Sequence, residues 1–167
     1  MLLEEFNSAD RADAAIAVKP ALDIARWIDE IVDGRPYTSV DALADAALSV
    51  AAPLSEAELD GALAHHPRIG AKVDGTSAEA AHSRREQPSV DEVTAAALVE
   101  GNRAYEERFD RVFLVRAAGR SAQEILALLH ERLGNTDEQE LAVVDRQLRE
   151  IAALRLTAAI ETEGASA

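Results

Sequence analysis

Apolar residues recur at three- and four-residue spacing along most of the chain, which is the period of an amphipathic α-helix. The longest such stripe lies near the C-terminus, and its predicted buried positions are Leu141, Val144, Leu148, Ile151, Leu154 and Ala158. A shorter face consists of Leu22, Ile24, Ala25, Trp27, Ile28 and Ile31. Pro20 suits the first turn of that helix, where its missing N–H costs nothing, and Gly34 is a typical helix end. The pattern predicts helix nearly throughout.

Four capping boxes mark the starts of further helices. In each, a Ser or Thr is followed three residues later by Glu or Gln, so that side chains and backbone N–H groups can bond reciprocally. The pairs are Ser55…Glu58, Ser89…Glu92, Ser121…Glu124 and Thr136…Gln139, and they open helices predicted over 56–64, 90–109, 122–133 and 137–161. Other predicted helices are a short one within 2–18 capped by Ser8 or Asp10, one from Ser39 or Asp41 to Val50, and a short one over 77–85.

Only one run favours a strand, Val112-Phe113-Leu114-Val115, and it is too short to build a sheet. We interpret it as an extended connector buried among helices. The predicted fold class is therefore all-α: a single-domain bundle of about seven to eight helices with one short extended connector. The domain is predicted over residues 1–167, with a frayed tail at 161–167. At 167 residues the chain is long enough to bury a sizeable core.

Composition narrows the classes of function. The chain has no cysteine, which excludes disulfides and thiolate chemistry. Its formal net charge of −14 leaves no basic surplus for the phosphates of nucleic acid. No apolar run approaches the roughly 20 residues that span a bilayer, so no membrane partner is expected. An anionic ligand would be repelled at long range, and any anion site must therefore be locally basic.

Positive charge gathers in one neighbourhood of this acidic chain, at Arg68, Lys72, Arg84 and Arg85. Such a cluster is what an anion site requires; the alternative is charge balancing on the surface. His66 lies in the same stretch, directly before Pro67, where the helix over 56–64 should stop. A histidine mounted stiffly at a helix end is a candidate acid–base group. The alternative is a capping histidine or one at the edge of the core.

A second polar group precedes Pro88. Ser83 lies three residues before Glu86 and four before Gln87, so these side chains can share a helical face. A hydroxyl, a carboxylate and an amide suit a small polar ligand rich in carbonyl and N–H groups, and the alternative is a solvated helix end. No metal site is predicted, because the spacing matches no zinc pattern among His65, His66, His82, Glu79 and Glu86.

Arg155 lies inside the last predicted helix, next to the predicted buried stripe. A buried arginine requires a partner, because an unpaired buried charge is very costly. That partner is Glu86, another acid, or an anionic ligand.

Several of these residues lie in motifs that occur in one order along nearly the whole chain. They are His65–Gly70, Ser83–Gln87, Asn102…Tyr105…Phe109…Phe113–Val115, Gly119–Ala122, Glu124–Leu126, Arg132-Leu133…Asn135 and Ile151…Leu154-Arg155-Leu156. Together they resemble the family of 2-oxo-4-hydroxy-4-carboxy-5-ureidoimidazoline (OHCU) decarboxylases. One departure is Asp110, which stands where the family usually has glycine. Aspartate can take the positive φ that glycine provides in a turn.

The resemblance implies an all-α fold, frequent dimers, and no metal or organic cofactor. The implied reaction removes carbon dioxide from OHCU, a small anion, and delivers S-allantoin in urate (purine) degradation. His66 matches the catalytic histidine and Glu86 its acidic partner. Substrate-contacting positions are matched by Pro67, Ser83, Gln87 and Arg155, and by the connector Phe113, Leu114, Val115, Arg116 and Ala117.

We therefore expect a carbon–carbon lyase that acts on OHCU as a homodimer. An acidic chain without a C-terminal Ser-Lys-Leu signal favours the cytoplasm over the peroxisome. One alternative is a catalytically inactive helical module that binds a purine-degradation metabolite or partner, against which the presence of both His66 and Glu86 argues. Another is a metal-dependent hydrolase, which activity surviving a chelator would exclude.

Overall fold

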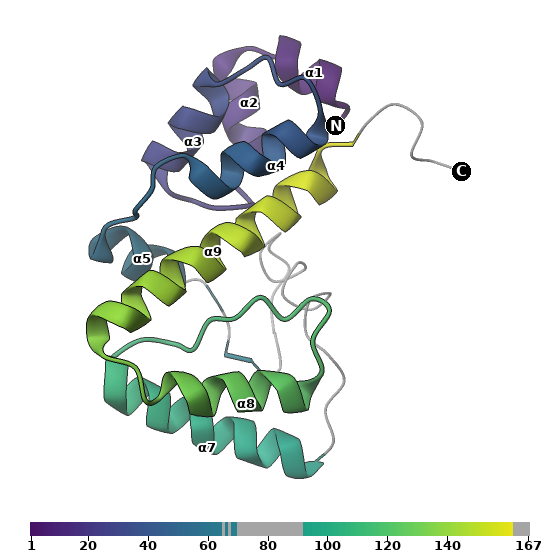
Figure 1. Cartoon of the computed structure of the whole chain (residues 1–167). Coiled ribbons are helices and arrows are strands. Elements are labelled where there is room, and N and C mark those ends of the chain that lie inside the picture. The colour runs from purple at the N-terminus through teal and green to yellow at the C-terminus, as the bar shows by residue number, and fades with distance from the viewer. Residues whose placement is uncertain (65, 67, 70–91, 162–167) are drawn as a thin grey trace. The chain divides into compact units, whose positions relative to one another are not determined.

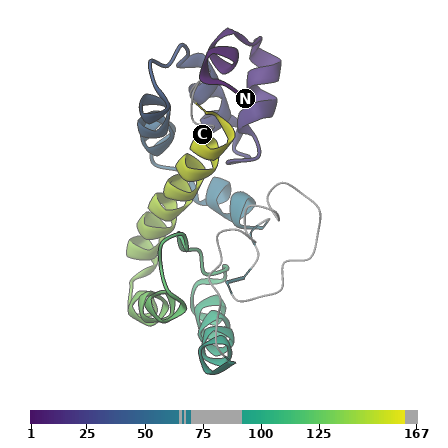
Figure 2. The ribbon, with the colours of Figure 1, turned by 90° about the vertical axis from the view of Figure 1, so that its right-hand side faces the viewer.

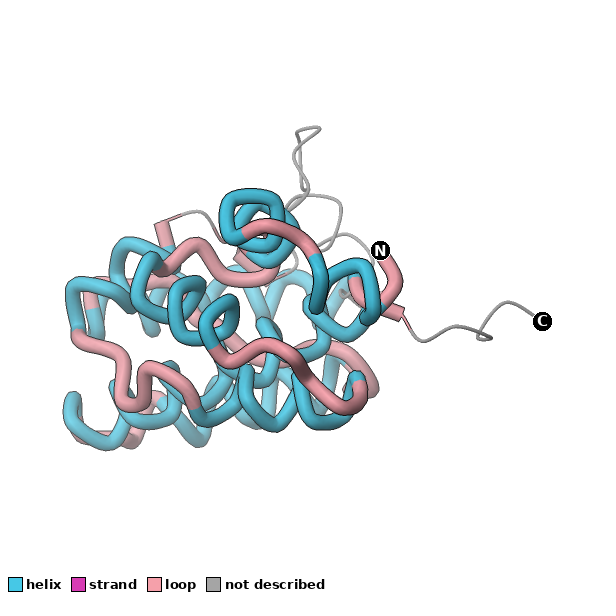
Figure 3. Tube along the Cα trace, turned by 90° about the horizontal axis from the view of Figure 1, so that it is seen from above, coloured by secondary structure: helices cyan, strands magenta, loops and turns pink. Residues whose placement is uncertain are grey.

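The computed structural model describes residues 1–64, 66, 68–69 and 92–161. These residues form eight helices and no strand, which confirms the all-α prediction (Figures 1 and 3). The helices are α1 (Leu3–Ser8), α2 (Arg11–Val18), α3 (Ala25–Asp33), α4 (Val40–Ser49), α5 (Glu56–Leu63), α7 (Glu92–Phe109), α8 (Ala122–Arg132) and α9 (Asp137–Ala159). The contacts divide the chain into two compact units, residues 1–54 with 149–167 and residues 55–148, which are described separately.

The first unit contains α1 to α4 and the second half of α9. Its core includes Trp27, whose side chain is fully buried and donates from Nε1 to the Ala47 carbonyl at 3.1 Å. Arg149 of α9 is 4% exposed and donates to the Val50 and Ala51 carbonyls in the loop after α4. The N-terminus lies beside the end of α9 (Figure 2), where the Met1 ammonium donates to the carbonyl of the final helical residue at 3.1 Å.

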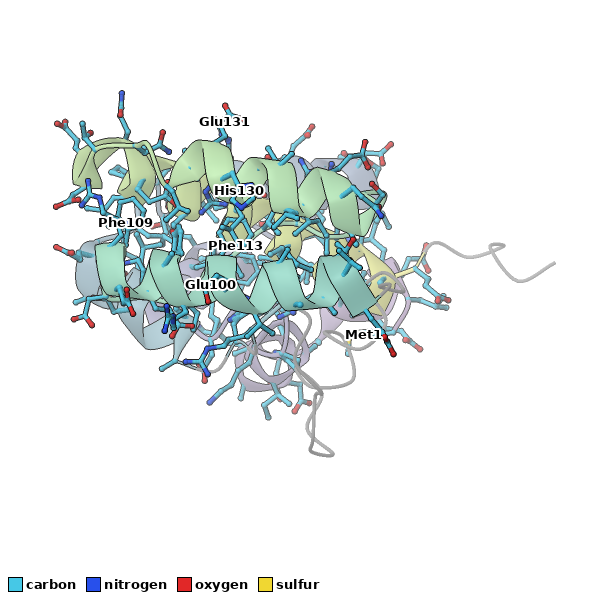
Figure 4. The ribbon with its side chains drawn as sticks, turned by 90° about the horizontal axis from the view of Figure 1, so that it is seen from below. Met1, Glu100, Phe109, Phe113, His130 and Glu131 are labelled. Atoms are coloured by element: carbon cyan, nitrogen blue, oxygen red, sulfur yellow. The ribbon has the colours of Figure 1, made fainter. Side chains whose placement is uncertain are left out.

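The second unit contains α5, α7, α8 and the first half of α9. Helices α7 and α8 lie side by side (Figures 1 and 4), and Gly101 of α7 allows this close approach to Leu129 of α8. The core around them consists of Ile69, Leu98, Tyr105, Phe109, Phe113, Val115, Ala117, Ile125 and Leu129. Residues 112–117 between α7 and α8 are neither helix nor strand, which confirms the predicted connector.

Polar side chains cap the N-terminal ends of the helices largely as predicted. The capping boxes at Ser55, Ser121 and Thr136 are formed, with reciprocal side-chain and backbone bonds in each. Asp10 caps α2 and Ser39 caps α4, so each pair of alternatives is resolved. The box at Ser89 and the short helix over 77–85 lie outside the described residues, as does the predicted frayed tail beyond Glu161.

Two details of the helix prediction are wrong. Pro20 lies in a turn, and α3 begins five residues later at Ala25 after an extended N-cap, Ile24. In α9, Val144, Leu148 and Ile151 are buried and Leu141 is half-buried, but Leu154 is 40% exposed and Ala158 is exposed. The buried face of this half of the helix includes Ala152 and Leu156. Leu154 is two residues from each, a rotation of about 200° that places it on the opposite side of the helix.

At Asp110 the chain turns out of α7 with a φ of +53°. This is the left-handed region, which glycine adopts without cost and aspartate adopts more readily than most residues. The aspartate therefore takes the backbone conformation for which a glycine is suited, and the chain continues into the buried connector.

Candidate active site

His66 follows the C-terminal end of α5, as predicted. Its backbone N–H donates to the Leu63 carbonyl at 2.9 Å, and its ring Nδ1 lies 3.0 Å from the Ala62 carbonyl. A carbonyl oxygen only accepts, so Nδ1 carries the proton of this hydrogen bond. The tautomer of the half-buried imidazole is thereby fixed, and in its neutral form Nε2 is the ring nitrogen without a proton.

The segment after His66 is fastened to α7 at two points. The Arg68 guanidinium binds the Glu106 carboxylate with two hydrogen bonds, one of them 2.6 Å from Nη2 to Oε2. The Asn102 side chain, 3% exposed, donates from Nδ2 to the Ile69 carbonyl at 3.0 Å. Both contacts join residues more than thirty positions apart. They restrict the backbone that carries the histidine.

The Arg68–Glu106 pair changes the predicted electrostatics. The Arg68 guanidinium lowers the pKa of the Glu106 carboxyl below its ordinary value, so the pair is ionised at neutral pH. The pairing of Arg68 with an acid favours surface charge balancing over membership of an anion site. The other members of the predicted basic cluster, Lys72, Arg84 and Arg85, lie outside the described residues.

A pocket of about 270 Å³ adjoins this segment and is lined by Arg68, Ile69, Val99, Asn102, Arg103 and Glu106. Asn102 Oδ1 is buried and has no hydrogen-bond partner in the described part of the chain. Asn102 thus lines the pocket while its donor is engaged with the backbone.

The connector Phe113–Ala117 is buried along most of its length. Phe113, Leu114, Val115 and Ala117 are each at most 5% exposed, while Arg116 is half-buried. Phe113 lies between α7 and α8 (Figure 4), with its ring edge-on to Tyr105 at 5.2 Å between centroids. The Leu114 carbonyl accepts from Arg132 at 2.6 Å, and the Arg116 N–H donates to Gln147 Oε1 at 2.8 Å. Side chains of α8 and α9 therefore hold the connector's backbone.

Arg155 is 3% exposed on α9, so the prediction that it is buried is confirmed. It belongs to the unit of residues 1–54 with 149–167, whereas His66 and the connector belong to the other. Pro67, Ser83, Glu86 and Gln87 lie outside the described residues. The roles predicted for these five residues stay predictions.

Sequence reasoning gave no role to several side chains that hold the candidate site. Asn102, Tyr105 and Arg132 appeared only as parts of the family motifs, and Glu106 and Glu140 not at all. A signal existed for Asn102, because an amide among apolar neighbours on one helix face requires partners when buried. The glutamates resemble the solvated glutamates around them, and only the fold distinguishes them.

Two further findings concern the described residues. No helix there is long and apolar enough to cross a membrane. No three His, Asp or Glu side chains in these ranges gather closely enough to hold a metal ion.

Known proteins resemble this chain along most of its length. The model of the OHCU decarboxylase family matches residues 7–157. A 2-oxo-4-hydroxy-4-carboxy-5-ureidoimidazoline decarboxylase of Amia calva is 30% identical over 142 residues, 82% of this chain and 78% of that protein. The Haloferax volcanii protein of that name is 24% identical over 165 residues, 98% of each. A uric acid degradation bifunctional protein of Bacillus sp. (strain TB-90) is 24% identical over 160 residues, 93% of this chain but only 32% of that longer protein.

Solved structures share the fold. The crystal structure of an (S)-allantoin synthase matches 96% of this chain and 54% of its own with a TM-score of 0.71 and 19% identity. That of an OHCU decarboxylase in the presence of (S)-allantoin matches 83% of this chain and 92% of its own, with a TM-score of 0.64 and 22% identity. The structural likeness establishes the fold, and the family model, which extends across residues of both compact units, establishes the lineage: the chain belongs to the OHCU decarboxylase family.

Proposed function

We propose that this chain removes carbon dioxide from OHCU and delivers S-allantoin, with His66 and Glu86 as its acid–base pair. The observation that carries the proposal is the mounting of His66. Its tautomer is fixed by the Ala62 carbonyl, and the segment after it is fastened to α7 by Asn102. A positioned imidazole with one variable nitrogen is the group that proton transfer near neutral pH requires.

The chemistry balances with protein groups alone. The bond between the carboxylate carbon and the hydroxyl-bearing ring carbon breaks, and its electron pair moves toward the neighbouring ureido-bearing carbon as the hydroxyl becomes the carbonyl of allantoin. A proton then forms the new C–H bond, so each turnover takes up one proton and consumes no oxidant or reductant. His66 Nε2 accepts the proton of the substrate hydroxyl or delivers one to this carbon, and Glu86 stabilises the charged imidazole. Delivery from one fixed face sets the S configuration of the product.

The remaining predicted residues bind and orient the substrate. Arg155 supplies the positive charge that a small anion needs in a chain of net charge −14. Ser83, Gln87, Pro67 and the connector backbone fix the orientation of its carbonyl and N–H groups. Hydrogen-bond donors aimed at the oxygen where charge develops lower the barrier to carbon dioxide loss.

Assembly as a homodimer and a cytoplasmic location belong to the same proposal. They are supported by the family resemblance and by the acidic composition. Sedimentation equilibrium of the purified chain tests the first, and imaging of the tagged protein in its host cell tests the second.

The test of the function follows optical activity. OHCU is generated from urate by urate oxidase and hydroxyisourate hydrolase, the chain is added, and circular dichroism is recorded. We expect a rapid S-allantoin signal that His66→Gln abolishes. The matched control is His130→Gln, because His130 is an exposed histidine on α8 (Figure 4) and should leave the signal unchanged.

Each outcome distinguishes two possibilities. Full activity of His66→Gln would exclude the assigned acid–base role while leaving the activity itself. Decay at the uncatalysed rate to an optically inactive product, with the parent chain present, would favour the alternative of a catalytically inactive module that binds a purine-degradation metabolite.

A further inference from the structure

A charged pair is buried behind the connector. Arg132 of α8 and Glu140 of α9 are 5% and 1% exposed, and the Arg132 Nε and Nη2 lie 2.9 and 2.5 Å from Glu140 Oε1. The third guanidinium nitrogen, Nη1, donates to the Leu114 carbonyl at 2.6 Å. The pair therefore points one charged donor at the backbone of the connector.

Other side chains complete the coordination of this pair. The Tyr105 hydroxyl donates to Glu140 Oε1, and Asn135 Nδ2 donates to Oε2 at 2.7 Å. Burial raises the pKa of Tyr105, so its hydroxyl keeps the proton that it donates. The Arg132 guanidinium also lies over the ring of Phe113, 4.6 Å from its centroid. We call these residues, Tyr105, Arg132, Asn135 and Glu140, the connector network.

Stability alone does not explain a network of this kind. A buried ion pair loses so much hydration that apolar residues of similar volume stabilise a fold about as well. What the pair adds is a fixed orientation of the connector's peptide groups. The Leu114–Val115 peptide bond is trans, so its carbonyl and its N–H point in opposite directions. Holding the Leu114 carbonyl against Arg132 therefore also fixes the direction of the Val115 N–H.

A second hydrogen bond fixes the same stretch one residue further along. The Arg116 N–H donates to Gln147 Oε1 at 2.8 Å, and Gln147 is 6% exposed on α9. The two peptide planes on either side of Val115 are thus set by α8 and α9.

We propose that Arg132, held in place by Glu140 and Tyr105, is a positioning residue that sets the direction of the connector's peptide groups at the substrate site. This inference rests on the proposed function, because the connector's contact with substrate is what the family resemblance implies. The three side chains act through the backbone of Leu114 and Val115 and are assigned no contact with the reacting atoms.

The decisive variant removes both charges together. In Arg132→Met/Glu140→Leu no buried charge is left alone, so the fold should persist, but the Leu114 carbonyl loses its donor. We expect kcat to fall about ten- to a hundredfold, because misplacement of an orienting group by about an ångström costs that much. We expect KM to change less and the allantoin formed to lose enantiomeric excess. The milder variant Tyr105→Phe removes one hydroxyl and should shift the same quantities in the same direction.

Hydrogen exchange provides a readout that does not depend on activity. Amide exchange in residues 112–117, followed by mass spectrometry, should accelerate in both variants while α7 and α8 stay protected. The matched control is Arg11→Met/Asp33→Leu, the same pair of replacements at an exposed ion pair whose side chains are 57% and 64% exposed. It should change neither exchange in the connector nor kcat.

The outcomes separate this inference from the function on which it rests. A parent chain without decarboxylase activity refutes the function, and exchange in the connector still decides whether the network holds it. Folded variants with parental exchange, kcat and enantiomeric excess overturn the positioning role. If Arg132→Met/Glu140→Leu does not fold, the same three quantities measured on Tyr105→Phe decide between the two outcomes.

Discussion

Two helical glycines provide a direct test of how tightly the second unit is packed. A Cβ added at Gly61 of α5 meets nothing within 4 Å, whereas one added at Gly101 of α7 lies 2.7 and 3.1 Å from the two methyl groups of Leu129. Leu129 is fully buried, so its methyl groups cannot move into solvent. The same substitution, glycine to alanine, therefore separates helix propensity from overpacking.

The expected magnitudes have opposite signs. Alanine is favoured over glycine in a helix by about 1 kcal/mol, so Gly61→Ala should stabilise the chain by about that amount. At Gly101 the same gain opposes an overpacking cost of about 1–3 kcal/mol, leaving a net loss of about 0–2 kcal/mol. The difference between the two variants should therefore be about 1–3 kcal/mol.

Urea unfolding followed by far-ultraviolet circular dichroism measures both values. The double variant Gly101→Ala/Leu129→Val shortens the opposing side chain and should recover part of the overpacking cost. If Gly101→Ala stabilises the chain as much as Gly61→Ala, then the Leu129 side chain can move to accommodate the added methyl group, and the close α7–α8 contact does not require glycine at position 101. The contact matters for function because Asn102, which fastens the His66 segment, is the next residue of α7.

Three further predictions concern other parts of the chain. Asn102→Leu leaves the Ile69 carbonyl without its donor, so it should destabilise by about 1–3 kcal/mol and lower decarboxylase kcat, and unchanged kcat in the folded variant would contradict the fastening role. In the folded chain Arg68 holds the pKa of Glu106 below its ordinary value of 4.5. The ion pair therefore stabilises the fold above pH 4.5, and this stabilisation is lost as the pH falls through the pKa that Glu106 has in the folded chain. The gap in unfolding midpoint between parent and Glu106→Gln should therefore close in acid, and a gap that widens there would refute the pairing. Trp27 is the only tryptophan, so its fluorescence reports the first unit. For a single domain its urea midpoint should coincide with that from circular dichroism.

Helix starts were predictable because their signals are local. A capping box consists of residues three apart, and its bonds form within one turn, as at Ser121 and Glu124. The prediction that failed, a buried position for Leu154, also rested on a pattern of nearby residues. Leu154 fits the spacing of the predicted stripe that begins at Leu141, yet it is exposed, because small errors in a three-or-four rule accumulate along a long helix.

The side chains that hold the candidate site in place could not be predicted from such local rules. Glu106 and Arg68 are 38 positions apart, and Glu140 lies 35 positions from the tyrosine that binds it. Periodicity identifies which face of a helix is buried but not which group meets it. Local patterns still placed His66 at the end of the helix predicted over 56–64 and the connector after the helix predicted over 90–109, because neither placement depends on those contacts.

Three buried polar side chains of this fold donate to backbone carbonyls of loops. Asn102 donates to the Ile69 carbonyl, Arg132 to the Leu114 carbonyl, and Arg149 to the carbonyls after α4. In an all-α protein the helices satisfy their own backbone, so a loop that is buried must find hydrogen-bond partners from side chains. Buried donors on helix faces therefore mark the loops that the fold holds rigid. Two of the three loops held in this way, the segment after His66 and the connector, are those to which the proposed function assigns the chemistry. Loops of this kind suit a site for a small anion, because the N–H and carbonyl groups inside a helix are paired with one another except at its ends, whereas loop backbone can bind a substrate.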